Sequence, residues 1–252
     1  MFGQFVEKPL VGRRFAISDV HGCADTLQML LATRLQITPD DQVFLLGDYI
    51  NRGPNSAGVL QHLIDLQNTG FQVFPIRGNH EQILLNISEG VIPFTPLLGR
   101  AKDLTDENYK IFPHFFDFLD KMPHFIELDK FFLVHAGLNL QVENPLEDTT
   151  AMLWSKYMRV NQDFLKGKQV VHGHHITHLE DIRYHIRSKS DVLPLDNGCY
   201  KGTKEKQKYN YFGNLCALNL DTFELIVQKN IDKNPEKEEH KNLEKSEKLE
   251  EN

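Results

Sequence analysis

Metal-binding residue types recur along this chain in five short clusters that also contain glycine. The clusters are SDVHG at 18–22, GDYINRG at 47–53, GNHE at 78–81, HAG at 135–137 and HGHH at 172–175. Aspartate, histidine and asparagine offer oxygen and imidazole nitrogen donors without a thiolate, a set that suits Mn, Fe or Zn better than Ca. A single aspartate here would be equally typical of a helix cap after a strand, but the joint occurrence indicates a metal site.

Apolar runs precede these clusters and predict the strands that position them. Runs at 13–20, 42–48, 71–79, 131–137 and 168–174 each lead into a cluster. Further runs at 191–198, 213–220 and 223–230 predict more strands, the last two as a hairpin. Apolar residues at helical spacing over 24–35 and 55–68 give the order β-α-β-α-β. Because ligands of an open α/β sheet bind beyond the carboxyl ends of its strands, we expect the clusters to converge at one edge.

The middle of the chain is predicted to be helical. One helix begins near His80, and a second covers 107–121 with an interruption at Pro113. Residues 91–121 and 177–189 are expected to form the loops that determine substrate choice, with His175 and His178 on a loop. The glycines of the clusters are expected to let the backbone approach the metals closely.

The five clusters, read in order, resemble the GDxHG, GDxxDRG, GNHE, HAG and GH motifs of the metallophosphoesterases. The resemblance is to the phosphoprotein phosphatases and their bacterial relatives, and it extends from about Arg13 to Leu220. LWS at 153–155 and LDNG at 195–198 are also similar to segments of the bacterial members. The resemblance implies an α/β fold, a metallophosphoesterase-like sandwich of mixed β-sheets flanked by helices in a single domain.

The same resemblance implies a centre with two divalent metal ions, manganese first and iron or zinc as alternatives. The implied metal ligands, with Asp48 shared between the ions, are Asp19, His21, Asp48, Asn79, His135 and His174. Ions so held lower the pKa of a bridging water, and the resulting hydroxide attacks phosphorus without a covalent enzyme intermediate. His172 is taken as a supporting residue.

Other residues are implied to contact the substrate. His80 corresponds to the general acid and Arg52 to the clamp that holds two phosphate oxygens. Asn79 and His80 would face the substrate phosphate together with Arg52. Lys156 or Arg159, after the LWS segment, would supply a second cation by a looser match.

Asn51 departs from the family pattern, since protein phosphatases carry an aspartate there that pairs with the catalytic histidine. The amide oxygen can accept a hydrogen bond from His80, but without the carboxylate the protonated ring is stabilised less and its pKa falls. Leaving groups that are already good, such as an aryl alkoxide or a nucleotide phosphate, need less protonation. Asn51 is therefore a catalytic-site residue expected to influence substrate choice.

Three functions follow from these observations. The first is a serine/threonine phosphoprotein phosphatase that hydrolyses phosphate monoesters, favoured by GNHEQILL with Glu81 after the histidine. The alternative is a symmetric bis(5'-nucleosyl)-tetraphosphatase, because those enzymes also lack an acidic residue at position 51 and continue with a segment similar to NRGPNS. The third is a non-catalytic metal-binding scaffold. The expected partner is thus a phosphorylated protein or a small phosphoester or nucleotide.

Composition predicts the boundaries of the fold. The 252 residues are 40% apolar, which suits one domain at 13–229, with an N-terminal extension at 1–12. Residues 230–252 form a charged tail expected to be disordered.

Charge and hydropathy argue against several partners. The net charge of −7 argues against nucleic acid, and no apolar run reaches the roughly 18–20 residues of a membrane span. The start lacks the apolar core of a signal peptide, so we expect a cytoplasmic protein. Because no sustained coiled-coil heptads occur, we expect it to be a monomer. Cys23, Cys199 and Cys216 lack paired spacing and are expected to be reduced thiols without chemistry.

Overall fold

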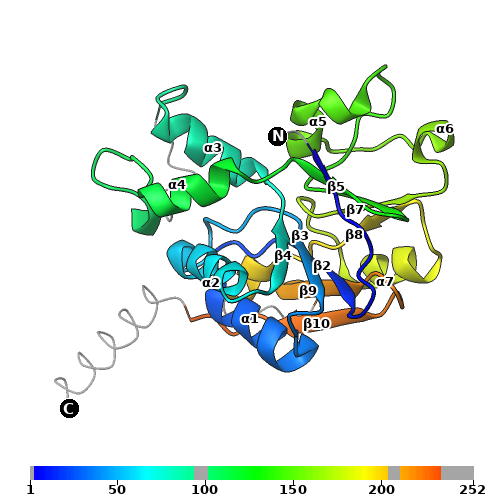
Figure 1. The fold of residues 1–252 in the computed structure, drawn as a ribbon, viewed down its shortest axis with the longest axis horizontal. Coiled ribbons are helices and arrows are strands. Elements are labelled where there is room, and N and C mark those ends of the chain that lie inside the picture. The colour runs from blue at the N-terminus through cyan, green and yellow to red at the C-terminus, as the bar shows by residue number, and fades with distance from the viewer. Residues whose placement is uncertain (1–2, 94–101, 204–210, 234–252) are drawn as a thin grey trace, which may run out of the picture.

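Two mixed five-stranded sheets form the centre of the computed structural model, which describes residues 3–93, 102–203 and 211–233 (Figure 1). The first sheet, in the order β10-β9-β2-β3-β4, contains β2 (Arg14–Ile17), β3 (Gln42–Leu45), β4 (Gln72–Pro75), β9 (Asn214–Asn219) and β10 (Leu225–Lys229). The second, in the order β1-β5-β6-β7-β8, contains β1 (Gly3–Phe5), β5 (Phe125–Glu127), β6 (Phe131–Val134), β7 (Gln169–His172) and β8 (Val192–Pro194). In each sheet three neighbouring strands run parallel, β2-β3-β4 and β6-β7-β8.

Helices cover the outer faces of the two sheets. The helices whose apolar residues share one cluster with the first sheet are α1 (Ala24–Met29) with its π-helical continuation η1 (Leu30–Leu35), α2 (Ser56–Asn68), α3 (Asn79–Ser88) and α4 (Pro113–Asp120). Those of α5 (Thr149–Trp154) and α6 (Gln162–Leu165) pack on the second sheet. Figure 1 shows α1 and α2 beside the first sheet and α5 near the second. Helix α7 (Leu179–Arg187) lies against β8.

Successive residues of a strand pack on opposite faces of its sheet, which gives a sandwich of four layers, with helices outside the two sheets. On β2, Phe15 and Ile17 join the apolar cluster with the first group of helices, whereas Ala16 joins the cluster between the sheets. On β6, Leu133 faces the same inter-sheet cluster, and Phe132 faces the cluster with α5 and α6. Because both faces of each sheet are covered, the central strands β2 and β6 are buried along their whole length. The predicted fold class, a sandwich of mixed sheets flanked by helices, is confirmed.

The middle of the chain differs from the prediction in two ways. Pro113 begins α4 instead of interrupting a longer helix, because proline lacks only an N–H that the first helical turn leaves unbonded. Residues 177–189, expected as a loop, contain α7, which has His178 as its N-cap residue. Ile182 and Ile186 lie one turn apart on this helix and pack into the inter-sheet cluster.

Residues near both ends of the described chain join the fold. Gly3–Phe5, within the expected extension, pairs in parallel with β5. Asp232, counted with the expected tail, accepts the backbone N–H groups of Asp25 at 3.0 Å and Thr26 at 3.1 Å at the start of α1. Since Cys23, the N-cap residue of α1, makes no side-chain capping bond, Asp232 takes over that function. The rest of the expected tail, 234–252, lies outside the described residues.

Arg14 connects the two sheets at the amino-terminal end of β2. Its side chain is 2% exposed and lies 2.6 Å from Asp129 in the turn between β5 and β6. It also lies 2.8 Å from Asp221 in the turn between β9 and β10. Burial of Arg14 is outweighed by these hydrogen bonds, so the arginine pKa is raised. One buried guanidinium thereby fixes turns that belong to different sheets.

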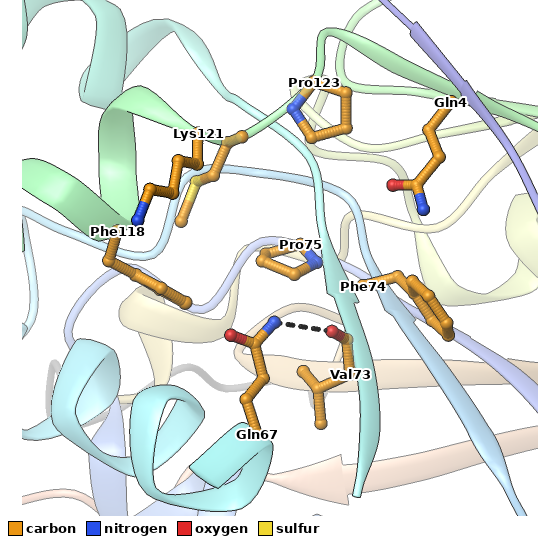
Figure 2. A pocket seen from close by; sticks show the side chains of 9 residues that line it. Gln4, Gln67, Val73, Phe74, Pro75, Phe118, Lys121 and Pro123 are labelled. Carbon is orange, nitrogen blue, oxygen red and sulfur yellow. Dashed lines mark hydrogen bonds between the residues drawn. The ribbon is translucent and has the colours of Figure 1, made fainter. Parts of the chain in front are cut away.

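A cavity of about 290 Å³ lies beside β4, the edge strand of the first sheet (Figure 2). Figure 2 shows Gln67 of α2 donating a hydrogen bond to the carbonyl of Val73, at 2.7 Å, on the floor of this cavity. Its lining includes Phe118 and Pro123 but none of the predicted site residues.

No helix in the described part of the chain is both long enough and apolar enough to cross a lipid bilayer.

Candidate metal centre and active site

The predicted ligands follow strand ends of both sheets, so the expectation of a single shared edge is corrected. Asp19 and His21 follow β2, Asp48 follows β3 and Asn79 begins α3 after β4, all from the first sheet. The ligands from the second sheet, after β6 and β7, are His135 and His174. Strand order was the missing information, because spacing along the chain does not tell which sheet a strand joins.

Three predicted metal ligands, Asn79, His135 and His174, lie together beside Asp48. His135 Nε2 lies 2.9 Å from Asn79 Oδ1, 3.1 Å from His174 Nδ1 and 3.4 Å from Asp48 Oδ1. The other nitrogen, His135 Nδ1, donates to the carbonyl of Leu46 at 2.8 Å, which leaves a lone pair on Nε2. If the Asn79 amide is rotated by 180°, its nitrogen faces His135 Nε2, His174 Nδ1 and the Asp48 carboxylate. In either orientation the imidazole and carboxylate lone pairs converge on one point.

Asp48 also belongs to a second group. His21 Nδ1 donates to the carbonyl of Ile50 at 3.0 Å, so His21 Nε2 presents a lone pair 3.5 Å from Asp48 Oδ2. His80 Nε2 lies 3.9 Å from the same oxygen. The groups His21–Asp48–His80 and Asp48–His135–His174 therefore share one carboxylate. This arrangement fits the predicted role of Asp48 as a ligand to both ions.

Asp19 is placed differently from the other predicted ligands. Its buried carboxylate accepts the backbone N–H of His174 at 3.0 Å and 3.1 Å. Among the described residues, Asp19 belongs to neither of the two metal-capable groups. The third member of the group with His21 and Asp48 is His80. His172 is also outside both groups, and its Nδ1 donates to the carbonyl of Gly173 at 2.9 Å. Asp19 thus links the turn after β2 to the turn after β7.

Buried acids and neutral imidazoles make the site suitable for cations. Burial raises the pKa of Asp48 to about 7 and that of Asp196 to about 6. Burial, followed by repulsion from these two carboxylates, raises the pKa of Asp19. Burial lowers the pKa of His135 to about 4 and that of His174 to about 3. Divalent cations among these groups would offset the repulsion and accept the imidazole lone pairs, so the donor set fits the implied metals.

The backbone at the site is left-handed at several residues other than glycine. The φ angles are +49° at His21, +53° at Asp48 and +65° at His174, and those of Asn51 and Arg52 are +73° and +68°. Such angles are uncommon outside glycine and concentrate at functional sites. Tight turns after the strands therefore direct these side chains toward the centre.

Glu81 anchors the loop that carries Asp48. One oxygen of its buried carboxylate accepts the backbone N–H groups of Asp48 at 2.9 Å and Gly78 at 3.0 Å. The other accepts those of Tyr49 at 2.8 Å and Ile50 at 3.3 Å. Burial, followed by the charge of Asp48, raises the Glu81 pKa to about 8, while the backbone donors act in the opposite sense. In the sequence Glu81 indicated only a subfamily, and its contacts with the backbone were not predicted.

Gly78 allows the close approach that the glycines were expected to provide. A Cβ atom at this position would lie 2.3 Å from the backbone nitrogen of Asp48 and 2.4 Å from its Oδ1. A side chain at residue 78 would therefore displace the shared ligand.

His80 lies between two donor groups. The Asn51 amide nitrogen is 3.1 Å from His80 Nδ1, so the nitrogen, and not the expected amide oxygen, faces the ring. On the other side, Arg52 Nη2 is 3.5 Å from His80 Nε2. Burial, followed by the charge of Arg52, lowers the pKa of His80 to about 3. These surroundings favour the neutral imidazole, in agreement with the expected effect of Asn51.

Tyr200 fixes the predicted phosphate clamp and was missed by sequence reasoning. Arg52 Nη1 donates to the Tyr200 hydroxyl at 3.0 Å, and the guanidinium lies 4.8 Å from the centre of the tyrosine ring. Tyr200 is in η5 (Cys199–Thr203), directly after LDNG. In the sequence, the only sign of this role was the position of Tyr200 close after the LDNG motif.

The LWS segment reaches the edge of the site. The centre of the Trp154 ring lies 6.4 Å from that of His174, and His175 Nε2 donates to the carbonyl of Ser155 at 3.0 Å. Lys156 and Arg159, the looser candidates for a second cation, are exposed on the residues that follow α5. Arg159 lines a cavity with Trp154.

Comparisons with known proteins agree with this geometry. The family model of calcineurin-like phosphoesterases matches residues 13–222. The symmetrical bis(5'-nucleosyl)-tetraphosphatase of Dechloromonas aromatica is 35% identical over 127 residues, which is 49% of this chain and 43% of the relative's length. The chain thus matches less than half of that relative.

Two solved structures share the fold. One, provisionally named a diadenosine tetraphosphatase, is 23% identical, with a TM-score of 0.62 over 92% of this chain and 99% of that one. The other, a serine/threonine phosphatase from Saccharomyces cerevisiae, is 14% identical, with a TM-score of 0.63 over 92% and 85% of the chains. At these identities the similarity speaks for the fold alone. Because the family model covers most of the described residues, the chain belongs to the calcineurin-like phosphoesterases, a family of metal-dependent phosphoester hydrolases.

Proposed function

We propose that this chain is a symmetric bis(5'-nucleosyl)-tetraphosphatase, which cleaves the central anhydride of a dinucleoside tetraphosphate into two nucleoside diphosphates. The contact between the Asn51 amide nitrogen and His80 Nδ1, at 3.1 Å, carries this proposal. The name of the relative at 35% identity supports it. We therefore prefer the tetraphosphatase, which the sequence offered as the alternative, to the protein phosphatase.

The chemistry of the leaving group connects this contact to the substrate. A serine alkoxide is a poor leaving group and needs a proton as the bond to phosphorus breaks. A nucleoside diphosphate leaves as a weakly basic phosphate and needs little protonation. His80, with donors at both ring nitrogens and no carboxylate partner on Nδ1, is poorly arranged to hold a second proton. The site thus suits an anhydride better than an alkyl monoester.

Each site residue has a role in this reaction. Asp48, His135, His174 and Asn79 would hold one divalent cation, and His21 with Asp48 a second, with Asp19 beside them. When bound, these ions supply Lewis acidity and an activated water. Arg52, fixed by Tyr200, orients the phosphate that is attacked. His80, whose Nε2 lies 3.5 Å from Arg52 Nη2, hydrogen-bonds to a phosphate oxygen next to the arginine. Mixed nitrogen and oxygen donors favour manganese, with iron or zinc as substitutes.

The phosphoprotein phosphatase remains the competing function, because the fold is shared with such an enzyme at 14% identity. Parallel turnover of diadenosine tetraphosphate, a phosphoserine peptide and p-nitrophenyl phosphate, with Mn²⁺ present, tests the choice. We expect ADP as the sole nucleotide product and a higher kcat/KM for the tetraphosphate than for the peptide. Faster peptide turnover, or AMP and ATP as products, would overturn the proposal.

Loss of catalysis must be separated from loss of folding. Asp48→Asn removes the shared carboxylate and should abolish turnover, while its circular dichroism spectrum stays that of the wild type. Absence of turnover of every substrate by metal-loaded wild-type protein would instead favour the scaffold function.

A further inference from the structure

A second cavity, of about 370 Å³, lies beside the candidate metal centre. Its lining includes Trp154, Tyr157 and Arg159 from the LWS segment and the residues that follow, and Asn139 and Gln141 from the segment after β6. The volume falls within the roughly 300–1,000 Å³ range of small-molecule sites in proteins. None of the predicted metal ligands is in its lining.

Two large aromatic side chains at this cavity face solvent. Tyr157 is 91% exposed and Trp154 is 45% exposed. Exposed aromatic rings are the usual platforms on which nucleobases stack, because every base has a π-face. Arg159 adds a guanidinium, which can stack on a base or meet a phosphate.

The polar groups of the cavity suit a neutral ring system with hydrogen-bonding edges. Asn139 and Gln141 provide amide groups that also have partners in the wall, since Asn139 Oδ1 accepts the backbone N–H of Gln141 at 3.3 Å and Gln141 Nε2 donates to the carbonyl of Arg159 at 3.4 Å. A side-chain amide has two N–H groups and two lone pairs, so each keeps hydrogen-bonding capacity for a ligand. The one carboxylate of the lining, Asp148, is already engaged, because it accepts the backbone N–H of Ala151 at 2.9 Å and the Asn139 amide at 3.1 Å. These two hydrogen bonds therefore partly stabilise the Asp148 carboxylate before a ligand binds.

The position of the cavity relates it to the reaction. The Trp154 ring lies 6.4 Å from the predicted ligand His174, and a Cβ at Gly137 of the HAG motif would be 3.3 Å from the Cβ of Ser155. In a dinucleoside tetraphosphate, one phosphate and one ribose separate each base from the phosphate nearest the cleaved bond. A base subsite must therefore lie beside the metal centre and outside it, as this cavity does.

We propose that this cavity, with Trp154 and Tyr157 as its stacking platform and Arg159 as its cation, is a subsite for one nucleoside of the substrate. The inference rests on the proposed tetraphosphatase function and names the part of the chain that recognises the base. Trp154 and Tyr157 are specificity residues of the binding step, and neither contacts the reacting atoms.

Trp154 is the sole tryptophan of the 252-residue chain, so intrinsic indole fluorescence reports directly on the cavity. The probe is adenosine, which has a base and no phosphate, added to the full chain with excitation where adenosine does not absorb. We expect saturable quenching by adenosine and none by ribose 5-phosphate. Quenching that is absent, or linear with adenosine concentration, would overturn the proposal.

A pair of tyrosine variants provides the matched control. Tyr157→Ala should weaken adenosine binding about 5- to 150-fold, the range for loss of one stacking aromatic. Tyr184 of α7 is 63% exposed and is not in the lining of the cavity, so Tyr184→Ala should leave adenosine affinity unchanged. Equal affinities in both variants would assign the quenching to another surface.

Turnover separates failure of the subsite from failure of the proposed function. If diadenosine tetraphosphate is cleaved to ADP but Tyr157→Ala leaves its KM unchanged, the subsite is wrong and the function stands. If adenosine quenches Trp154 but the tetraphosphate is not cleaved, the tetraphosphatase function is wrong, and the cavity binds a nucleoside of another substrate. We expect a raised KM with little change in kcat for Tyr157→Ala.

Discussion

Glu81 accepts the backbone N–H of Asp48 at 2.9 Å, so the ligand shared by both predicted metal sites is held by the first turn of α3. The same carboxylate accepts three further backbone N–H groups, from residues 49, 50 and 78. The loop after β3 and the start of α3 are thus fixed by one side chain, which explains why Glu81 is fully buried.

The variant Glu81→Gln tests this anchor. An amide replaces one acceptor oxygen by a donor, which leaves about half of the backbone N–H groups without an acceptor. Each unsatisfied buried group costs about 1–3 kcal/mol, so we expect a loss of about 2–5 kcal/mol in the free energy of unfolding. Urea unfolding measures it. Glu89→Gln, at the exposed end of the same helix, is the control and should change stability little.

The variant Asn51→Asp tests the link between His80 and substrate choice. A carboxylate would accept the N–H of His80 Nδ1 and stabilise the doubly protonated ring. We expect kcat for alkyl phosphates to rise on the order of tenfold relative to aryl phosphates, a fraction of the ~10²–10⁴-fold that a general acid supplies. Asn55→Asp, at the exposed N-cap of α2, is the charge-matched control. Equal changes for both substrate classes would contradict the role of His80.

Removal of metal should lower both activity and stability. The group Asp48–His135–His174 takes ligands from both sheets, so a cation bound there would connect the sheets in addition to serving catalysis. We expect EDTA to abolish turnover and to lower Tm, and Mn²⁺ to restore both, because a ligand that binds only the folded state stabilises it. A stripped sample that turns over substrate as fast as the loaded one would be incompatible with the metal centre.

The variant Arg14→Leu should destabilise the sandwich. It leaves Asp129 and Asp221 without their shared partner and removes the link between turns of different sheets. The carboxylates left behind are 40% and 22% exposed and can be solvated, so we expect a loss of about 1–3 kcal/mol from the missing charged hydrogen bonds, which urea unfolding detects. Arg183→Leu, whose ion pair with Glu180 is exposed on both sides, is the control and should cost at most about 1 kcal/mol.

Asp41 makes stability depend on pH in the acid range. Burial, which raises its pKa, is outweighed by hydrogen bonds from Arg13 and Thr38, and the pKa is about 2. Because the folded value lies below the unfolded value of about 3.9, the contribution is complete above about pH 4 and is lost as pH falls toward 2. We expect Asp41→Asn to lower stability by about 1–2 kcal/mol at neutral pH, allowing for the exposed partner Arg13.

Unfolding of wild-type protein and the Asp41→Asn variant across this pH range measures the difference. The two stabilities should converge as the pH approaches 2, while Asp40→Asn, at the exposed neighbour, should follow the wild type throughout. A constant difference between wild type and Asp41→Asn would rule out titration of Asp41 as the cause.

Strand ends and ligand types could be predicted because they depend on local pattern. Each apolar run that leads into a metal-binding cluster contains a strand, and His135 and His174 meet Asp48 as expected. Which strand joins which of the two sheets could not be predicted, because this depends on pairing between distant segments. Helix α7 was taken for a loop because only a few apolar residues, such as Ile182 and Ile186, mark its buried face.

Residues that act through the backbone were the hardest to predict. Glu81 binds N–H groups, which every residue but proline has, so no sequence pattern marks its targets. Asp232 caps α1 from more than two hundred residues away, and in the sequence it is one acidic residue at the start of a charged segment. Tyr200 acts through Arg52, so its role follows only from their proximity.

The left-handed backbone of His21, Asp48 and His174 sets stability and activity against each other. Glycine at any of these positions would relieve a conformational penalty of about 1–3 kcal/mol, yet it would delete the donor atom that the turn presents. Selection for thermal robustness alone would drive these positions toward glycine. Histidine and aspartate at these positions therefore lower the stability of the fold while they provide the donor atoms of its reactive centre.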